Sequence, residues 1–190
     1  MITKAKMQWA RGYWQAHNAV KESITTMLTT NFSPGQVFKA DHGGWYRALF
    51  APSVQAGILK PEHLAGYRGH QVFIRNAEHV PPPKEAVRDM MPALSELLEN
   101  EPSAAVRAVL GHFIFVFIHP YIDGNGRSAR FTMNAMLVSG GYPWTVVKLE
   151  GRDDYMASLN EASARQNIRP FVEHIYASMK NDLVAKPRKP

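Results

Sequence analysis

The chain of 190 residues contains no cysteine. This absence excludes disulfide bonds, a thiolate nucleophile and a cysteine-based zinc site, and it is compatible with a reducing compartment. The longest apolar run, Phe113 to Ile118, is far shorter than the roughly 20 residues that a membrane-spanning helix needs. The first residues show no long apolar core of a secretory signal. We therefore expect a cytoplasmic protein without a membrane partner.

The charge balance is basic, with 22 lysine and arginine residues against 16 acidic ones and a net charge of +6. Such a balance suits nucleic acid or an acidic partner. The basic residues are scattered, however, and they form no stripe interleaved with aromatic residues, so nucleic acid is not the expected partner. The length fits one domain. We assign residues 1–183 to a single catalytic domain and residues 184–190 to a basic, proline-containing tail.

Apolar residues recur at helical spacing through most of the chain, which predicts an all-α domain. One stretch differs, because Val72 and Ile74 alternate with Phe73 and Arg75 between residues 71 and 80. This alternation predicts a short β-hairpin, ended by three prolines, that lies as a flap on the helical body. We expect residues 104–118 to form the buried centre, since their last turns are apolar nearly all round. Helices are predicted over residues 4–30 (one or two), 45–50, 84–99, 104–118, 127–138, 153–164 and 170–183.

Residues 119–130 read His-Pro-Tyr-Ile-Asp-Gly-Asn-Gly-Arg-Ser-Ala-Arg and combine the parts of a phosphate site. A glycine-rich loop that opens a helix presents backbone N–H groups to an anion. Arg127 and Arg130 are three positions apart, so they share a face of that helix and can hold the same polyphosphate. Asp123 is a hard ligand suited to Mg²⁺, and His119 is a base that titrates near neutral pH.

Each of these features alone has an ordinary structural explanation, such as a helix cap, a surface turn or a solvated pair of arginines. Their combination in this order predicts a catalytic phosphate site.

The dodecamer resembles the signature of the Fic family, His-Pro-Phe-x-(Asp/Glu)-Gly-Asn-Gly-Arg-x-x-Arg. It departs from that signature at Tyr121, where the family usually has phenylalanine. Tyrosine keeps the apolar ring but adds a hydroxyl group that needs a partner when buried. The resemblance extends to residues 57–62, 67–82 and 152–171, and so to nearly the whole chain. It implies a Fic-like helical domain with the hairpin flap over the active site.

The resemblance also implies an activity, which is transfer of AMP from ATP to a side-chain hydroxyl of a target protein. His119 is then the general base, and Asp123 holds the Mg²⁺ ion. Phosphate binding falls to the second half of the motif, with Arg127 on the leaving pyrophosphate and Arg130 on the γ-phosphate. The amides of Gly124, Asn125 and Gly126 form the anion hole.

Three further expectations come from the same resemblance. The flap aligns the target, with Ile74 and Arg75 closest to it, by adding a strand of the target to its edge. Tyr155 and Asn160 are candidate neighbours of the adenine. Many family members carry an inhibitory helix, (Ser/Thr)-x-x-x-Glu-(Gly/Asn). Residues 95–100 match its letters but lie where the family does not place it, so we expect no self-inhibition, an inhibitory partner, or an inhibitory helix outside this sequence.

Other functions remain open at this point. The same fold supports a kinase, another nucleotidyl transfer or removal of AMP from a target. A toxin or regulator that binds nucleotide without turnover is a further alternative. The intact Gly124, Gly126, Arg127 and Arg130 favour the adenylylating orientation of ATP over that of a kinase.

Overall fold

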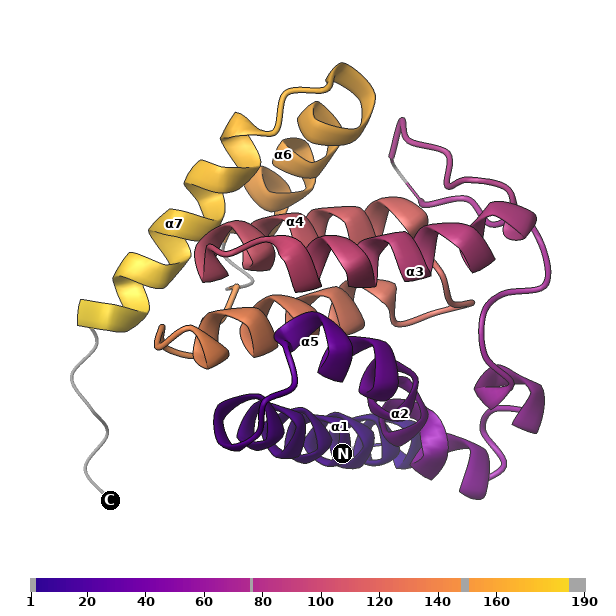
Figure 1. Ribbon diagram of the computed structural model, residues 1–190. Coiled ribbons are helices and arrows are strands. Elements are labelled where there is room, and N and C mark those ends of the chain that lie inside the picture. The colour runs from indigo at the N-terminus through magenta and orange to yellow at the C-terminus, as the bar shows by residue number, and fades with distance from the viewer. Residues whose placement is uncertain (1–2, 76, 148–150, 185–190) are drawn as a thin grey trace.

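The computed structural model describes residues 3–75, 77–147 and 151–184, the last four by their backbone alone (Figure 1). All elements in these ranges are helices, and no strand occurs among them, which confirms the all-α class. No helix there is both long and apolar enough to cross a membrane. The elements are α1 (Lys4–Thr29), α2 (Pro34–Gln55), the 3-10 helix η1 (Pro61–Leu64), α3 (Lys84–Asn100), α4 (Ala104–Ile118), α5 (Asn125–Ser139), α6 (Arg152–Arg165) and α7 (Arg169–Val184).

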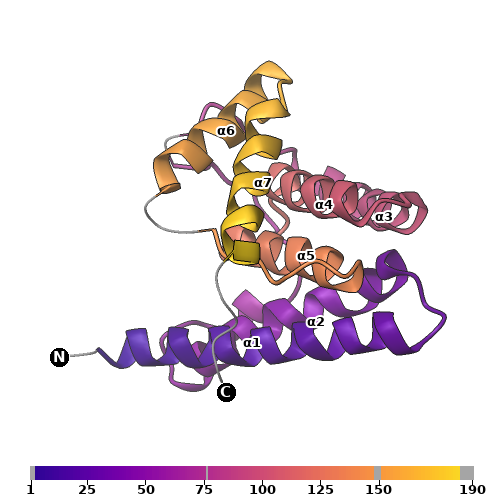
Figure 2. The same cartoon turned by 90° about the vertical axis from the view of Figure 1, so that its left-hand side faces the viewer.

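Helix α5 lies between the pair α1 and α2 on one side and α4 on the other (Figures 1 and 2). Helix α3 packs on α2 and α4, and α6 with α7 forms a pair that contacts α4. Helices α1 and α2 approach closely at Gly12, where a Cβ atom would lie 2.0 Å from the carbonyl oxygen of Leu49. The connection between α4 and α5, together with the first turns of α5, carries the dodecamer.

The core is built mainly around α5, of which ten residues are buried against six in α4. Phe131, Met133 and Met136 of α5 are at most 1% exposed. The expectation that residues 104–118 form the centre is therefore only partly right. Helix α4 is more apolar in composition, but α5 is enclosed by three other helices, so its small and polar residues are buried as well.

Helix α2 is much longer than the predicted helix over residues 45–50. A capping box of Ser33 and Gln36 begins it, and Pro34 occupies its first turn, where a missing N–H does no harm. Its interior contains Gly43, Gly44 and Pro52, which argue against a helix. Burial of one apolar face overrides these local preferences. The residues of that face are Val37, Phe38, Trp45, Tyr46, Leu49 and Phe50.

The predicted β-hairpin over residues 71–80 does not appear as strands in the part of the chain that the structure describes. Residues 71–75 and 77–83, here called the 71–83 loop, have no regular secondary structure, and Ala77 N donates to Ile74 O at 3.2 Å. Gln71 bridges its two arms from Nε2 to the carbonyl oxygen of Pro81 at 2.8 Å. A ladder of two short strands is marginal without further strands, and the three prolines lack N–H donors for it.

Candidate active site

His119 ends α4 in a left-handed backbone conformation, with φ 53° and ψ 58°. Its N–H donates to Phe115 O at 3.0 Å, and Pro120 then prevents continuation of the helix. A left-handed non-glycine residue costs roughly 1–2 kcal/mol. Other contacts must therefore hold this backbone in place.

Those contacts come from Arg68, which is 3% exposed although it carries a charge. Its Nε donates to His119 O at 2.8 Å, and its backbone N–H donates to Pro120 O at 2.8 Å. The guanidinium also donates to the carbonyl of His70 and to that of Pro82 in the 71–83 loop. The cation thus lies at the carboxyl end of α4, where the helix dipole favours positive charge. Arg68 thus joins the loop that begins at His119 to the 71–83 loop.

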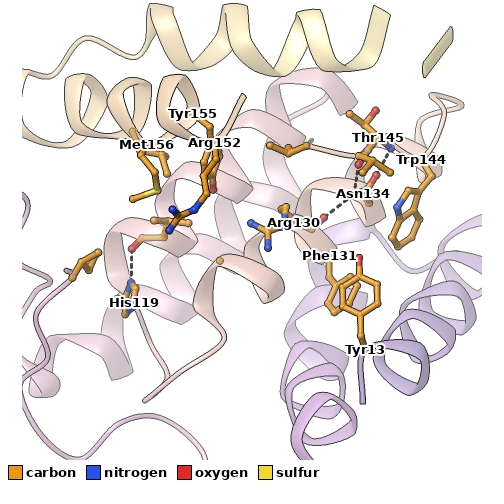
Figure 3. A pocket seen from close by; sticks show the side chains of 16 residues that line it. Tyr13, His119, Arg130, Phe131, Asn134, Trp144, Thr145, Arg152, Tyr155 and Met156 are labelled. Carbon is orange, nitrogen blue, oxygen red and sulfur yellow. Dashed lines mark hydrogen bonds between the residues drawn. The ribbon is translucent and has the colours of Figure 1, made fainter. Parts of the chain in front are cut away.

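The imidazole of His119 is oriented by its Nδ1, which lies 3.2 Å from Val116 O. A carbonyl can only accept, so Nδ1 carries the proton and Nε2 of the neutral ring keeps its lone pair. Burial lowers the pKa of His119, with the carbonyl of Val116 opposing that shift. The ring lines the main cavity (Figure 3). It is thereby suited to accept a proton at Nε2 near neutral pH.

The loop that follows is closed by the side chain of Asn125. Its Oδ1 accepts from Tyr121 N at 2.9 Å, and its Nδ2 donates to Tyr121 O at 2.8 Å. Asp123 Oδ1 accepts from Gly124 N at 2.6 Å. Among the described residues, the N–H groups of Asn125 and Gly126 have no acceptor, as is usual in a first helical turn. Both amides are therefore open to an anion, whereas the Gly124 amide is engaged by Asp123.

Gly124 is the N-cap of α5 with φ 76°. A Cβ atom there would lie 2.7 Å from the ring of Phe50. The ring of Phe50 also lies 4.9 Å from Cζ of Arg127, in a cation–π contact. Arg127 Nη2 forms an ion pair with Asp123 Oδ2 at 3.3 Å. Helix α2 therefore positions both the turn and the first arginine of the motif.

The main cavity has a volume of about 690 Å³ and is lined by His119, Gly126 and Arg130 from the dodecamer. Elements distant in sequence complete its walls (Figure 3). Asn134 in α5 holds one wall in place, because its amide bonds Thr145 N at 2.6 Å and Thr145 O at 3.0 Å. The other walls are formed by Tyr13, Ile74, Phe131, Trp144, Arg152, Tyr155, Met156 and Leu159, among others.

The predicted residues outside the motif fall into two groups. Ile74 and Tyr155 line the cavity, whereas Arg75 is exposed and does not line it. Asn160 does not line it either, and its Oδ1 accepts from Glu78 N at 3.3 Å. That bond, with the Arg165–Glu78 ion pair at 3.0 Å, ties the 71–83 loop to α6.

Residues 95–100, which match the letters of an inhibitory helix, belong to α3. Ser95 Oγ donates to Met91 O at 3.0 Å, and Glu99 Oε1 accepts from Gln36 Nε2 at 2.8 Å. Glu99 therefore supports the N-terminus of α2, and it forms no ion pair with either motif arginine among the described residues.

A metal ion in this site would have one protein ligand. No group of three or more histidine or acidic side chains that could hold a metal occurs within the ranges the structure describes. The Asp123 carboxylate, at 69% exposure, remains accessible. One carboxylate with phosphate oxygens and water fits Mg²⁺, which rarely takes an all-protein cage.

Sequence reasoning gave no role to several residues of the site. Arg68 is one arginine among many in a loop, and its burial has no local signal. Tyr46 and Phe50 read as ordinary core residues of a helix, and Tyr13 and Trp144 lie far from the motif in sequence. Only the three-dimensional arrangement brings them together.

Comparison with known proteins decides the family. The model of the Fic/DOC family matches residues 38–137, more than half of the chain. The chain belongs to the Fic/DOC family.

Relatives and solved structures agree with this assignment. The protein adenylyltransferase Fic of Nematostella vectensis is 38% identical over 123 residues, which are 63% of this chain and 28% of that protein. Residues 134–508 of Fic-1 from C. elegans share the fold with a TM-score of 0.78 and 23% identity, over 95% of this chain and 51% of that one. IbpAFic2, in a structure covalently tethered to Cdc42, gives a TM-score of 0.63 with 17% identity, over 95% and 58% of the two chains.

The expected Fic-type helical fold is thus confirmed. This Fic domain spans about a quarter of the length of the curated relative it matches.

Proposed function

We propose that this chain transfers AMP from ATP to a side-chain hydroxyl of a target protein. The observation that carries the proposal is that His119, Gly126 with its open amide, and Arg130 line one cavity. Sequence relatives that carry the name protein adenylyltransferase support it.

In the proposed reaction, the target hydroxyl transfers its proton to His119 Nε2 as its oxygen bonds to the α-phosphorus of ATP. The bond from that phosphorus to the bridging oxygen of the β-phosphate breaks, and pyrophosphate leaves with the electron pair. A positioned general base typically contributes about 10²–10⁴-fold to the rate. The Val116 carbonyl, by fixing the proton on Nδ1, keeps Nε2 available for this step.

Three kinds of group would stabilise the negative charge of the polyphosphate. The amides of Asn125 and Gly126 at the start of α5 face the α-phosphate, and Gly124 joins them if Asp123 releases its N–H. Arg127 holds the leaving pyrophosphate and Arg130 the γ-phosphate. Asp123 is the residue that would hold Mg²⁺, which neutralises charge on the phosphate oxygens when bound.

The remaining assignments are part of the same proposal. Residues 1–183 act as one catalytic domain, and the protein works in the cytoplasm. The 71–83 loop aligns the target, with Ile74 at the cavity and Arg75 at the exposed rim. Tyr155 and Asn160 lie toward the adenine. An inhibitory partner or helix outside this sequence restrains the activity. The solved structure of IbpAFic2 tethered to Cdc42 supports a protein as target.

The test is incubation with Mg²⁺ and α-labelled ATP, alone and with a cell lysate. Label on protein that is lost in His119→Ala and kept in His63→Ala is expected. His63 lies outside the cavity, in η1, so it controls for removal of an imidazole. Transfer from γ-labelled but not α-labelled ATP would replace the proposal with a kinase. Nucleotide binding without either transfer would favour a regulator that binds nucleotide without turnover.

A further inference from the structure

Glu78, in the 71–83 loop, is tied to α6 through both its side chain and its backbone. Arg165 Nη2 lies 3.0 Å from its Oε1 and 3.4 Å from its Oε2. The backbone N–H of Glu78 donates to Asn160 Oδ1 at 3.3 Å. Arg165 is itself oriented by Glu161, which its Nη1 approaches to 3.2 Å. Because one cation pairs with two carboxylates, the contact is a network, which holds side chains better than an isolated surface ion pair does.

The next residue in the loop, His79, is held by α4 instead. Its Nε2 lies 2.9 Å from Phe117 O, and because a carbonyl can only accept, this nitrogen carries a proton. Its ring also stacks on the ring of Phe117, with the centroids 4.1 Å apart and 29° between the planes. Phe117 belongs to the last turn of α4, where backbone carbonyls have no partner within the helix. His79 therefore caps the helix end that leads into His119.

The same short segment reaches the main cavity. Ala77, which precedes Glu78, donates its N–H to Ile74 O at 3.2 Å, and Ile74 lines the cavity. The two helices that hold Glu78 and His79 also contribute to the cavity wall (Figure 3). The residues concerned are Val116 and His119, in and directly after α4, and Tyr155, Met156 and Leu159 in α6.

Helices α4 and α6 pack on each other far less extensively than α4 and α5 do. In the core they meet where Nε2 of the fully buried His112 lies 2.8 Å from the hydroxyl of Tyr155. Glu78 and His79 provide a second connection, closer to solvent, between α6 and the end of α4. The loop cannot shift against either helix at this point without breaking one of these contacts.

We propose that Glu78 and His79 form a bridge that positions the 71–83 loop, and with it Ile74, between the wall formed by α6 and the general base at the end of α4. Both are positioning residues, since neither lines the cavity. The inference rests on the proposed function only in assigning the loop to the target and the α6 wall to the nucleotide. Loss of the bridge therefore weakens engagement of the target more than binding of ATP.

Solvent exchange of backbone amides, measured by NMR without nucleotide, tests the bridge directly. The informative amides are those of Ala77 and Glu78, which donate to Ile74 O and Asn160 Oδ1. Arg165→Ala should accelerate exchange at both by about two- to fivefold, as expected for an exposed ion pair. His79→Phe keeps a stacked ring but removes a hydrogen bond, and it should accelerate exchange by about fivefold.

The control is Arg169→Ala, which removes an exposed arginine and its ion pair with Glu173, 2.8 Å long, from α7. Exchange at the two loop amides should then equal that of the wild type. Unchanged exchange in both Arg165→Ala and His79→Phe would overturn the bridge, and so would an equal acceleration in Arg169→Ala.

Exchanging the two charges tests whether the ion pair itself positions the loop. Glu78→Arg and Arg165→Glu should each accelerate exchange of the loop amides. The double variant should return it to within about twofold of the wild type, because the network again contains one cation and two carboxylates, with Glu161 as the third member. A double variant that is no slower than the single variants would contradict a role of the ion pair.

Kinetics separate the bridge from the proposed function. With α-labelled ATP and the target identified by its label, Arg165→Ala should raise the KM for the target about two- to fivefold. The kcat value, and the dissociation constant of ATP measured by calorimetry, should stay within about twofold. An equal loss of ATP affinity would overturn the positioning role. If the exchange measurements behave as expected while the wild type transfers no AMP, the bridge stands and the adenylyltransferase proposal falls.

Discussion

Arg68 Nε donates to the carbonyl oxygen of His119 across 2.8 Å, although 51 positions separate the two residues in sequence. The bond holds the left-handed backbone on which the orientation of the imidazole depends. Lysine at this position keeps the charge but cannot reproduce several directed N–H bonds. We expect Arg68→Lys to lower the free energy of unfolding by about 2–4 kcal/mol and the rate of AMP transfer by at least about tenfold.

Urea denaturation and the α-labelled ATP assay measure these two effects. Arg88→Lys is the control, because Arg88 is exposed on α3 and forms no ion pair within the described part of the chain. A loss of activity at unchanged stability would show that the hydrogen bonds of Arg68 orient the backbone at His119 without adding to the free energy of unfolding. If Arg68→Lys had the same stability and activity as the wild type, the role of Arg68 in holding the backbone at His119 would be contradicted.

At Tyr121, in contrast to Arg68, we expect a substitution that keeps or raises stability. Its ring stacks on Tyr46 at 3.7 Å, and its hydroxyl is buried without a hydrogen-bond partner. Such an unsatisfied group costs about 1–3 kcal/mol. Tyr121→Phe should therefore leave AMP transfer unchanged and keep or raise the free energy of unfolding, by up to about 2 kcal/mol. Tyr176→Phe, at an exposed tyrosine, is the control. A clear destabilisation would mean that the hydroxyl has a bound water as partner.

The buried histidine predicts a pH dependence of stability. Because the pKa of His112 falls from 6.5 to about 3 on folding, the unfolded chain binds more protons between these values. Stability is then fully present above about pH 6.5 and is lost as pH falls toward 3, with a slope of up to about 1.4 kcal/mol per pH unit from this residue. Denaturation at pH 7.5, 6.5, 5.5 and 4.5 measures the slope.

His112→Phe should reduce that slope without abolishing it. The pKa values of His42 and His119 are also lowered by burial, so they contribute in the same direction. An equal slope in the variant and the wild type would show that His112 does not titrate in this window.

Gly124 allows backbone strain and steric clash to be separated. Gly124→Ala places a side chain at φ 76° and within 2.7 Å of the Phe50 ring, whereas Gly141→Ala meets a similar φ of 85° in open space. The second variant should lose about 1–2 kcal/mol from strain alone. The first should lose more, and it should also lose AMP transfer because Phe50 holds Arg127. Equal losses would rule out the clash.

Sequence patterns predicted the features that depend on residues close together in the chain, such as the bounds of most helices. Helical periodicity placed α3, α4, α6 and α7 nearly to their bounds, and the predicted helix over residues 127–138 lies within α5. The dodecamer lies within one helix end, one loop and one helix start, and three of its residues, His119, Gly126 and Arg130, meet at one cavity.

The sequence-based predictions of helix α2 and of the β-hairpin were wrong, because contacts between residues distant in sequence override local conformational preference there. The glycines and proline of α2 argue for a loop, yet its aromatic face is buried and the helix forms. The alternation of Val72 and Ile74 with Phe73 and Arg75 is real in exposure, since the first two are half-buried and the last two exposed. It reflects a loop lying on the body, since no neighbouring strand is present there to complete a sheet.

Tyr13 in the first long helix and Tyr155 in the sixth belong to the wall of one cavity. The segment that matches the family model, residues 38–137, contains every residue of the dodecamer but neither of these two, nor Trp144. A fragment trimmed to that segment would retain the complete signature but lack these parts of the cavity wall. In this protein the recognisable motif is therefore smaller than the unit that encloses the cavity, and sequence signatures alone would set the boundaries of that unit too tightly.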